Sequence, residues 1–207
     1  MNKFALTSLA ACLGLSIGVA NAELVTINGG TQITTPQSND VIVGYDMWDN
    51  ATLTIEDGAI LTFYFVGSES GYTNTLNTAF GTHAENNTIP GFPGELLFSG
   101  TYDDTNPALW FTSSGFAGQL VPGGGDAGKS IAFAYLNESF EVSIGPTEIV
   151  LFALDDAGAG PDDNHDDYVG YFVVSAAPVE EVPLPGAVWL FGSALLGFVT
   201  WSRRRAA

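Results

Sequence analysis

The residues best suited to chemistry in this 207-residue chain are acidic side chains that crowd together between positions 155 and 167. Six carboxylates fall within these thirteen residues: Asp155, Asp156, Asp162, Asp163, Asp166 and Asp167. Carboxylates this close repel one another unless a cation binds between them or water solvates them. Two interpretations follow, a calcium site and a solvated acidic loop.

The spacing of the second acidic run is that of a calcium ligand set. Asp162, Asn164 and Asp166 lie two residues apart, as the first ligands of a calcium-binding loop do. The rest of an EF-hand is missing, because Asp167 replaces the turn glycine and Val173 replaces the bidentate glutamate. A calcium site here would therefore not be an EF-hand. Its predicted ligands are Asp155, Asp162, Asn164 and Asp166, with Asp156, Asp163 and Asp167 as alternates.

Motifs for catalysis and nucleotide binding are weak. The run 123–130 matches G-x-x-x-x-G-K-S, but a phosphate-binding loop must lead into a helix, whereas the alternation of 131–135 predicts a strand. A serine nucleophile elbow is absent, because Glu69 stands where the serine of Gly-x-Ser-x-Gly should be. The two histidines, His83 and His165, have no visible nucleophile partner in the sequence. We therefore expect a protein without enzymatic activity and with no catalytic residues.

The charge distribution argues against nucleic acid as a partner. All 23 acidic residues lie between Glu23 and Glu181, where Lys129 is the single cation, so this segment carries a formal charge of about −22. Such a field repels polyanions and keeps an exterior domain soluble. Abundant aromatic and aliphatic residues argue against disorder. Cys12 is the one cysteine and precedes the acidic segment, so we expect no disulfide.

The middle of the chain alternates between apolar and polar residues in short runs typical of β-strands. Clusters of Gly, Asn, Asp, Pro and Ser separate these runs, and Glu56-Asp57-Gly58 predicts a hairpin turn. The predicted strands are 24–27, 41–43, 51–55, 60–66, 96–98, 109–111, 131–135, 149–152 and 168–174. No segment before Leu184 shows a sustained helical period. We expect an all-β, antiparallel β-sandwich of jelly-roll type over residues 23–176.

The N-terminus predicts export. Residues 1–22 combine Lys3, an apolar run and the cleavage pattern Ala20-Asn21-Ala22, so we expect a signal peptide that signal peptidase removes after Ala22. A lipoprotein-type cut before Cys12 is the competing possibility. It would leave an apolar run of only a few residues, which favours the later cut.

The C-terminus predicts a membrane-spanning segment. Residues 184–201 are uncharged and mostly apolar, and eighteen helical residues extend about 27 Å, enough to cross a hydrocarbon core. Arg203, Arg204 and Arg205 follow directly, which predicts that the residues before this segment lie outside the cytoplasm. Residues 177–183 are rich in proline and glutamate and predict an extended spacer. A permanent single-span anchor is the alternative to a processed tail.

The last 26 residues, 182–207, resemble the PEP-CTERM sorting signal in its VPLPA-type variant. The resemblance rests on three parts in a fixed order: a short motif, an apolar helix and an arginine cluster. The motif consists of Val182, Pro183, Leu184, Pro185, Gly186 and Ala187, with Gly186 where the variant usually has alanine. It implies recognition by an exosortase and cleavage near the motif. It also implies a Gram-negative bacterium, an inner-membrane intermediate anchored by the helix, and a final place on the cell surface or in the extracellular matrix.

Two segments of the middle domain are similar to uncharacterised exterior domains attached to PEP-CTERM tails. They are 67–74 and the acidic stretch within 152–170, and the resemblance assigns no activity to either. We expect a biofilm-associated surface or matrix protein, with calcium as the one candidate cofactor and matrix polysaccharide as a candidate partner. A carbohydrate-binding module using Trp48 and Trp110 is the alternative, and a secreted hydrolase is the third possibility. Exposed aromatic side chains in a row would favour carbohydrate binding, and buried ones the first interpretation.

Overall fold

The computed structural model describes residues 23–37, 39, 41–85, 88–125, 128–156 and 164–177. The described residues up to Ala176 belong to one compact unit. The predicted signal peptide, the predicted ligand Asp162 with its alternate Asp163, and the predicted sorting signal lie outside the described residues. Within the described part of the chain all regular elements are strands, and no helix there is long and apolar enough to cross a membrane.

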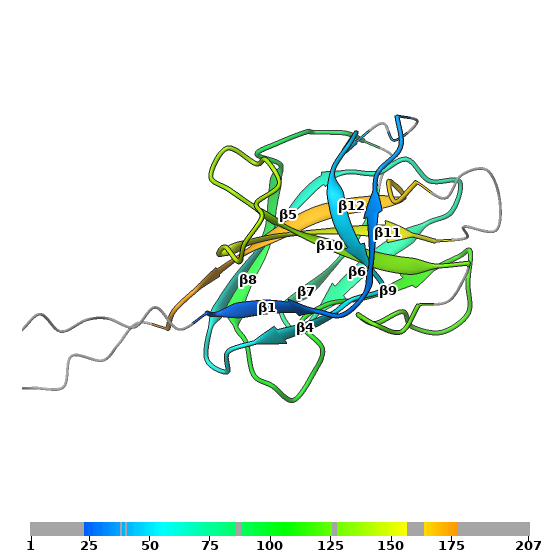
Figure 1. Ribbon diagram of the computed structural model, residues 1–207. Coiled ribbons are helices and arrows are strands. Elements are labelled where there is room, and N and C mark those ends of the chain that lie inside the picture. Colours follow the sequence, from blue (N-terminus) through cyan, green and yellow to red (C-terminus); the bar gives the residue numbers. More distant parts are fainter. Residues whose placement is uncertain are drawn as a thin grey trace, which may run out of the picture. The chain divides into compact units, whose positions relative to one another are not determined.

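The described strands form three antiparallel sheets (Figure 1). The largest sheet has seven strands, in the spatial order β2 (Thr31–Thr34), β3 (Asp46–Asp49), β10 (Ser130–Leu136), β11 (Ile149–Asp155), β12 (Tyr168–Ser175), β5 (Ile60–Gly67) and β8 (Glu95–Thr101). A three-stranded sheet has the order β7 (Gly81–Ala84), β6 (Asn74–Thr78) and β9 (Trp110–Ser113). The third sheet pairs β1 (Val25–Asn28) with β4 (Thr52–Ile55). This confirms the all-β, antiparallel prediction, and the arrangement is consistent with a β-sandwich.

The main hydrophobic core joins one face of the seven-stranded sheet to the two smaller sheets. Side chains from all three sheets pack together there, among them Phe63, Phe133, Phe152 and Phe172 from the large sheet, Leu76 and Phe111 from the three-stranded sheet, and Val25 and Ile55 from β1 and β4. A second buried cluster covers the opposite face of the large sheet and includes Ile42, Met47, Ala134, Leu151 and Tyr171. Strands β10, β11 and β12 are therefore apolar on both faces, which explains their nearly continuous apolar sequences.

Two sequence predictions about local structure are wrong. Residues 41–43 form a turn rather than a strand, because the side-chain oxygen of Asn39 accepts hydrogen bonds from the backbone amides of Val41 and Ile42. Such local side-chain bonds compete with strand pairing. Residues Glu56 to Gly58 do form a turn, but it is not a hairpin turn, because β4 pairs with β1 whereas β5 pairs with β12 and β8.

Gly170 is expected to tolerate no side chain, because β12 passes very close to its neighbours there. A Cβ atom at this position would lie 2.5 Å from Phe152 Cζ and 2.7 Å from the carbonyl oxygen of Tyr64. Gly170→Ala should therefore lower the free energy of unfolding by about 1–3 kcal/mol. Gly145→Ala is the matched control, since a Cβ atom there meets nothing within 4 Å. Equal denaturation midpoints for the two variants would contradict this packing.

Candidate functional site

Strand ends bring the acidic residues together at one end of the sandwich. Strand β11 ends at Asp155, and β12 begins directly after Asp167, antiparallel to β11. The end of β5 meets the start of β12, where Gly67 pairs with Val169. We call Asp155, Asp156, Asp166 and Asp167 the carboxylate cluster.

All four members of the carboxylate cluster are buried, with residue exposures between 1% and 8%. Removing an ionised carboxylate from water is costly unless a cation or hydrogen bonds compensate for it. Burial raises the pKa of Asp167 to about 8, and repulsion from Asp156 and Asp155 adds to the rise. A hydrogen bond that Asp156 N donates to Asp167 Oδ2, 2.8 Å long, opposes it. A carboxyl group with this pKa is mostly protonated at neutral pH.

Polar side chains from other strands surround Asp156. Its Oδ2 accepts hydrogen bonds from Ser70 Oγ at 2.7 Å and from Asn74 Nδ2 at 2.5 Å. Asn74 begins β6, so this contact joins the three-stranded sheet to the end of β11. Glu85 follows β7 directly, and its Oε1 accepts a 2.6 Å hydrogen bond from Asn74 N. The cluster is thus shared between two sheets.

The structure places three of the four predicted calcium ligands at this end. Asp155 pairs with Ser130 across β10 and β11, and Asn164 Nδ2 donates a 3.0 Å hydrogen bond to Asp166 Oδ2. The backbone oxygen of Asn164 accepts a 2.7 Å bond from Asn39 Nδ2. Among the described residues, no three His, Cys, Asp or Glu side chains are arranged as a metal site. Because Asp162 lies outside those residues, the predicted ligand set stays a prediction.

A contact that the sequence did not indicate joins His165 to Ser130 and Asp49. His165 Nε2 lies 3.0 Å from Ser130 Oγ and 3.2 Å from Asp49 Oδ1. Burial acts to raise the pKa of Asp49, but hydrogen bonds from His165 and Ser130 outweigh it and hold the pKa below its usual range. In a serine hydrolase the serine and the aspartate contact different nitrogens of the histidine. Here both oxygens face the same nitrogen, and Ser130 is buried, so this geometry does not provide a proton relay.

The structure also places the two other candidates from the sequence, His83 and the nucleotide-loop pattern. His83 Nδ1 lies 2.6 Å from the Tyr168 hydroxyl, and burial lowers the pKa of His83. The nucleotide-loop pattern leads into strand β10, as the sequence predicted, and the ammonium of Lys129 lies 5.7 Å above the Phe116 ring. A helix N-terminus that could bind phosphate is therefore missing after this loop.

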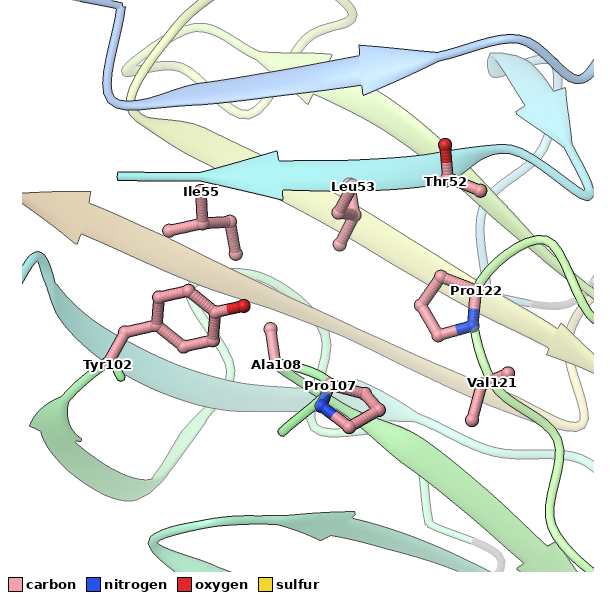
Figure 2. Close-up of a pocket in the computed structure, with 8 residues that line it drawn as sticks. All are labelled: Thr52, Leu53, Ile55, Tyr102, Pro107, Ala108, Val121 and Pro122. Atoms are coloured by element: carbon pink, nitrogen blue, oxygen red, sulfur yellow. The ribbon is translucent and has the colours of Figure 1, made fainter. Parts of the chain in front are cut away.

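A pocket of about 250 Å³ lies between β4 and the loops before and after β9, and no member of the carboxylate cluster lines it (Figure 2). Its lining is mainly apolar, with the hydroxyls of two residues added: Thr52, Leu53, Ile55, Tyr102, Pro107, Ala108, Val121 and Pro122. Such a lining contains neither a carboxylate pair nor a histidine, which acid–base chemistry would require.

Comparison with known proteins adds no relative. No protein-family model, curated protein or solved structure matches the chain. The fold and the site therefore define the chain only as an antiparallel, sandwich-like β protein with buried carboxylates at one end.

Proposed function

We propose that this chain is an exported, non-enzymatic protein of the cell surface or extracellular matrix of a Gram-negative bacterium, processed at its C-terminus by an exosortase. The observation that carries the proposal is the order of parts in the last 26 residues: the 182–187 motif, an apolar segment and three arginines. The signal peptide over 1–22, the transmembrane helix over 184–201 and the jelly-roll connectivity belong to the same proposal.

Two features of the described residues support a non-enzymatic role. The Asp49, Ser130 and His165 side chains meet without the geometry of a relay, because both oxygens face one imidazole nitrogen. The pocket in Figure 2 offers apolar side chains and hydroxyls instead of acid–base groups. Neither place presents a general base next to an accessible nucleophile, which hydrolytic catalysis by a serine would need.

The exposure of aromatic side chains favours the matrix role over carbohydrate binding. Among the described residues, Tyr72 is the one strongly exposed aromatic side chain, at 46%. Trp48 and Trp110 are only partly exposed, and the Trp48 ring packs edge-on against Tyr135 with centroids 6.3 Å apart. A sugar-stacking platform needs aromatic faces in a row that open to solvent, and these side chains do not provide one.

Processing can be tested by the intact mass of the protein recovered from the cell exterior. We expect a mature chain that begins at Glu23 and ends between Val182 and Ala187 in cells that have an exosortase. In cells without that enzyme, the tail with Arg203 to Arg205 should remain attached. If the three arginines persist in both strains, the tail is a permanent anchor and the sorting proposal is wrong.

A further inference from the structure

Three buried side-chain oxygens at the acidic end of the sandwich have no hydrogen-bond partner. They are Ser68 Oγ, Asn74 Oδ1 and Glu85 Oε2, and within the described part of the chain no other buried side-chain nitrogen or oxygen lacks a partner. Ser68 is 2% exposed and Asn74 is 0% exposed, so bulk water does not reach these two residues, whereas Glu85 is half-buried. Because buried polar groups are almost always paired in native proteins, three exceptions in one place mark a position that a bound ion or water would satisfy.

These oxygens belong to side chains that already contact one another. Asn74 and Glu85 are joined twice, since Asn74 N donates to Glu85 Oε1 at 2.6 Å and Glu85 N donates to Asn74 O at 2.9 Å. The Ser68 hydroxyl lies close enough to lower the pKa of Glu85, although it is outside hydrogen-bonding geometry. The three side chains are therefore neighbours, although they come from three separate positions at the ends of β5, β6 and β7.

These three side chains border the carboxylate cluster. Asn74 Nδ2 donates to Asp156 Oδ2, so the unpaired Oδ1 of the same amide lies beside the Asp156 carboxylate. Asp156 and Glu85 are near enough to repel each other, and this repulsion adds to the effect of burial on the pKa of Glu85. Two carboxylates, an amide oxygen and a hydroxyl thus lie near one another, with Ser68, Asn74 and Asp156 buried and Glu85 half-buried.

The chemistry of this donor set indicates a hard cation. All the unpaired atoms are oxygens, and neither sulfur nor imidazole nitrogen is among them. Calcium accepts about six to eight oxygen ligands and mixes carboxylate, amide, hydroxyl and water oxygens in irregular geometry. Magnesium requires a nearly ideal octahedron and keeps most of its water, which a buried and irregular set of oxygens does not suit.

We propose that Ser68 Oγ, Asn74 Oδ1 and Glu85 Oε2 bind a calcium ion next to the Asp156 carboxylate. The proposed ligands differ from those that the sequence suggested and link the large sheet to the three-stranded sheet. The ion would pair with oxygens that otherwise have no partner and would offset the repulsion between Glu85 and Asp156. It would thereby fasten two sheets together in a chain segment where we expect no disulfide.

The test is a calcium titration of the intact chain in mild detergent, by calorimetry and by thermal unfolding. Calcium at about a hundredfold above its dissociation constant should raise the melting temperature by roughly 5–10 °C. Sodium chloride of matched ionic strength should not, because screening alone acts on all charges alike. Equal shifts with both salts, or no heat of calcium binding, would overturn the proposal. Neither result would bear on export or tail processing.

The Glu85→Gln variant distinguishes calcium binding from a second explanation, in which Glu85 is protonated and donates a hydrogen bond to a neighbouring side chain. If a protonated Glu85 normally donates to Ser68 or Asn74, glutamine should mimic it, and the wild type should show no calcium response. If the site binds calcium, glutamine instead places an amide donor among the unpaired oxygens. The metal-free variant should then melt at or above the wild-type temperature. The rise in melting temperature that calcium causes in the wild type should be lost. A Glu85→Gln variant that keeps the wild-type calcium shift would contradict the assignment of Glu85 as a ligand.

Two further variants complete the design. Ser68→Ala removes an unpaired hydroxyl, so it should leave the metal-free melting temperature nearly unchanged and weaken calcium binding several-fold. Glu138→Gln removes one negative charge at an exposed position in the β10–β11 loop and should leave the calcium shift intact. If Glu138→Gln reduced the shift as much as Glu85→Gln did, the response would be one of total charge and not of a site.

Discussion

Phe63→Ala is expected to lower the free energy of unfolding by about 3–5 kcal/mol, a large part of the 5–15 kcal/mol typical of a domain. Phe63 is completely buried at the centre of the main core. Its ring lies 5.3–6.3 Å, centroid to centroid, from four others, those of Phe80, Phe98, Phe152 and Phe172. Removing the ring loses the free energy gained by transferring it from water to the core. It also leaves a cavity that the four neighbouring rings cannot fill without leaving their own positions.

The measurement is chemical denaturation of Phe63→Ala beside Leu96→Ala. Leu96 lies on β8, the edge neighbour of β5, but it is 60% exposed, so its loss should change stability by less than about 0.5 kcal/mol. Both proteins should have the same dependence of unfolding free energy on denaturant, because the fold is unchanged. A similar loss of stability for the two variants would mean that the main core is not centred on Phe63.

The sequence predicted both the strands that are buried on two faces and strands with one buried face, such as β5 at 60–66. The runs at 131–135, 149–152 and 168–174 became β10, β11 and β12, and each lies at the centre of the large sheet. The unpredicted strands β2, β3, β6 and β7 have the sequences TQIT, DMWD, NTLNT and GTHA. These short segments bury few apolar side chains, and they form because a neighbouring strand supplies hydrogen bonds. Pairing of that kind is not visible in local periodicity.

The candidate site was predictable only where its residues are adjacent in sequence. The acidic runs near 155 and 166 predicted a crowd of carboxylates, and the structure does bury Asp155, Asp156, Asp166 and Asp167 together. Ser68, Asn74 and Glu85 carry no local signal of a site, because each is an ordinary polar residue at a strand end. They meet the acidic runs only through pairing between segments about 70–90 residues apart, as in the Asn74–Asp156 contact. The resemblance of segment 67–74 to other exterior domains did not indicate which residues the segment contacts.

The stability of the calcium-free protein is expected to fall as the pH rises from 5 to 8, because of Asp167. Its pKa is about 8 in the folded protein and near 3.8 in an unfolded chain. Between those values the folded state binds one proton more than the unfolded state, so stability decreases with pH by about 1.4 kcal/mol per pH unit. Over three units the contribution of this residue reaches about 4 kcal/mol.

Asp167→Asn isolates this contribution, because asparagine resembles the protonated acid and its amide oxygen can still accept the hydrogen bond from Asp156 N. With EGTA present, the variant should already be ahead of the wild type by about 1.6 kcal/mol at pH 5, because the unfolded wild type ionises above pH 3.8. Between pH 5 and pH 8 this lead should grow by about 4 kcal/mol. The lowered pKa of His83 and the raised pKa of Glu85 also make stability depend on pH, but they do so in both proteins and cancel in the difference.

Glu138→Gln serves as the control for charge alone, since Glu138 is exposed and its replacement should give no pH-dependent difference of this size. A stability difference between Asp167→Asn and the wild type that stays constant from pH 5 to 8 would mean that Asp167 is already ionised in the fold at pH 5. The carboxylate cluster would then hold its charges through hydrogen bonds alone. Excess calcium should reduce the difference at pH 8, because a neighbouring cation favours the ionised form of Asp167 in the wild type.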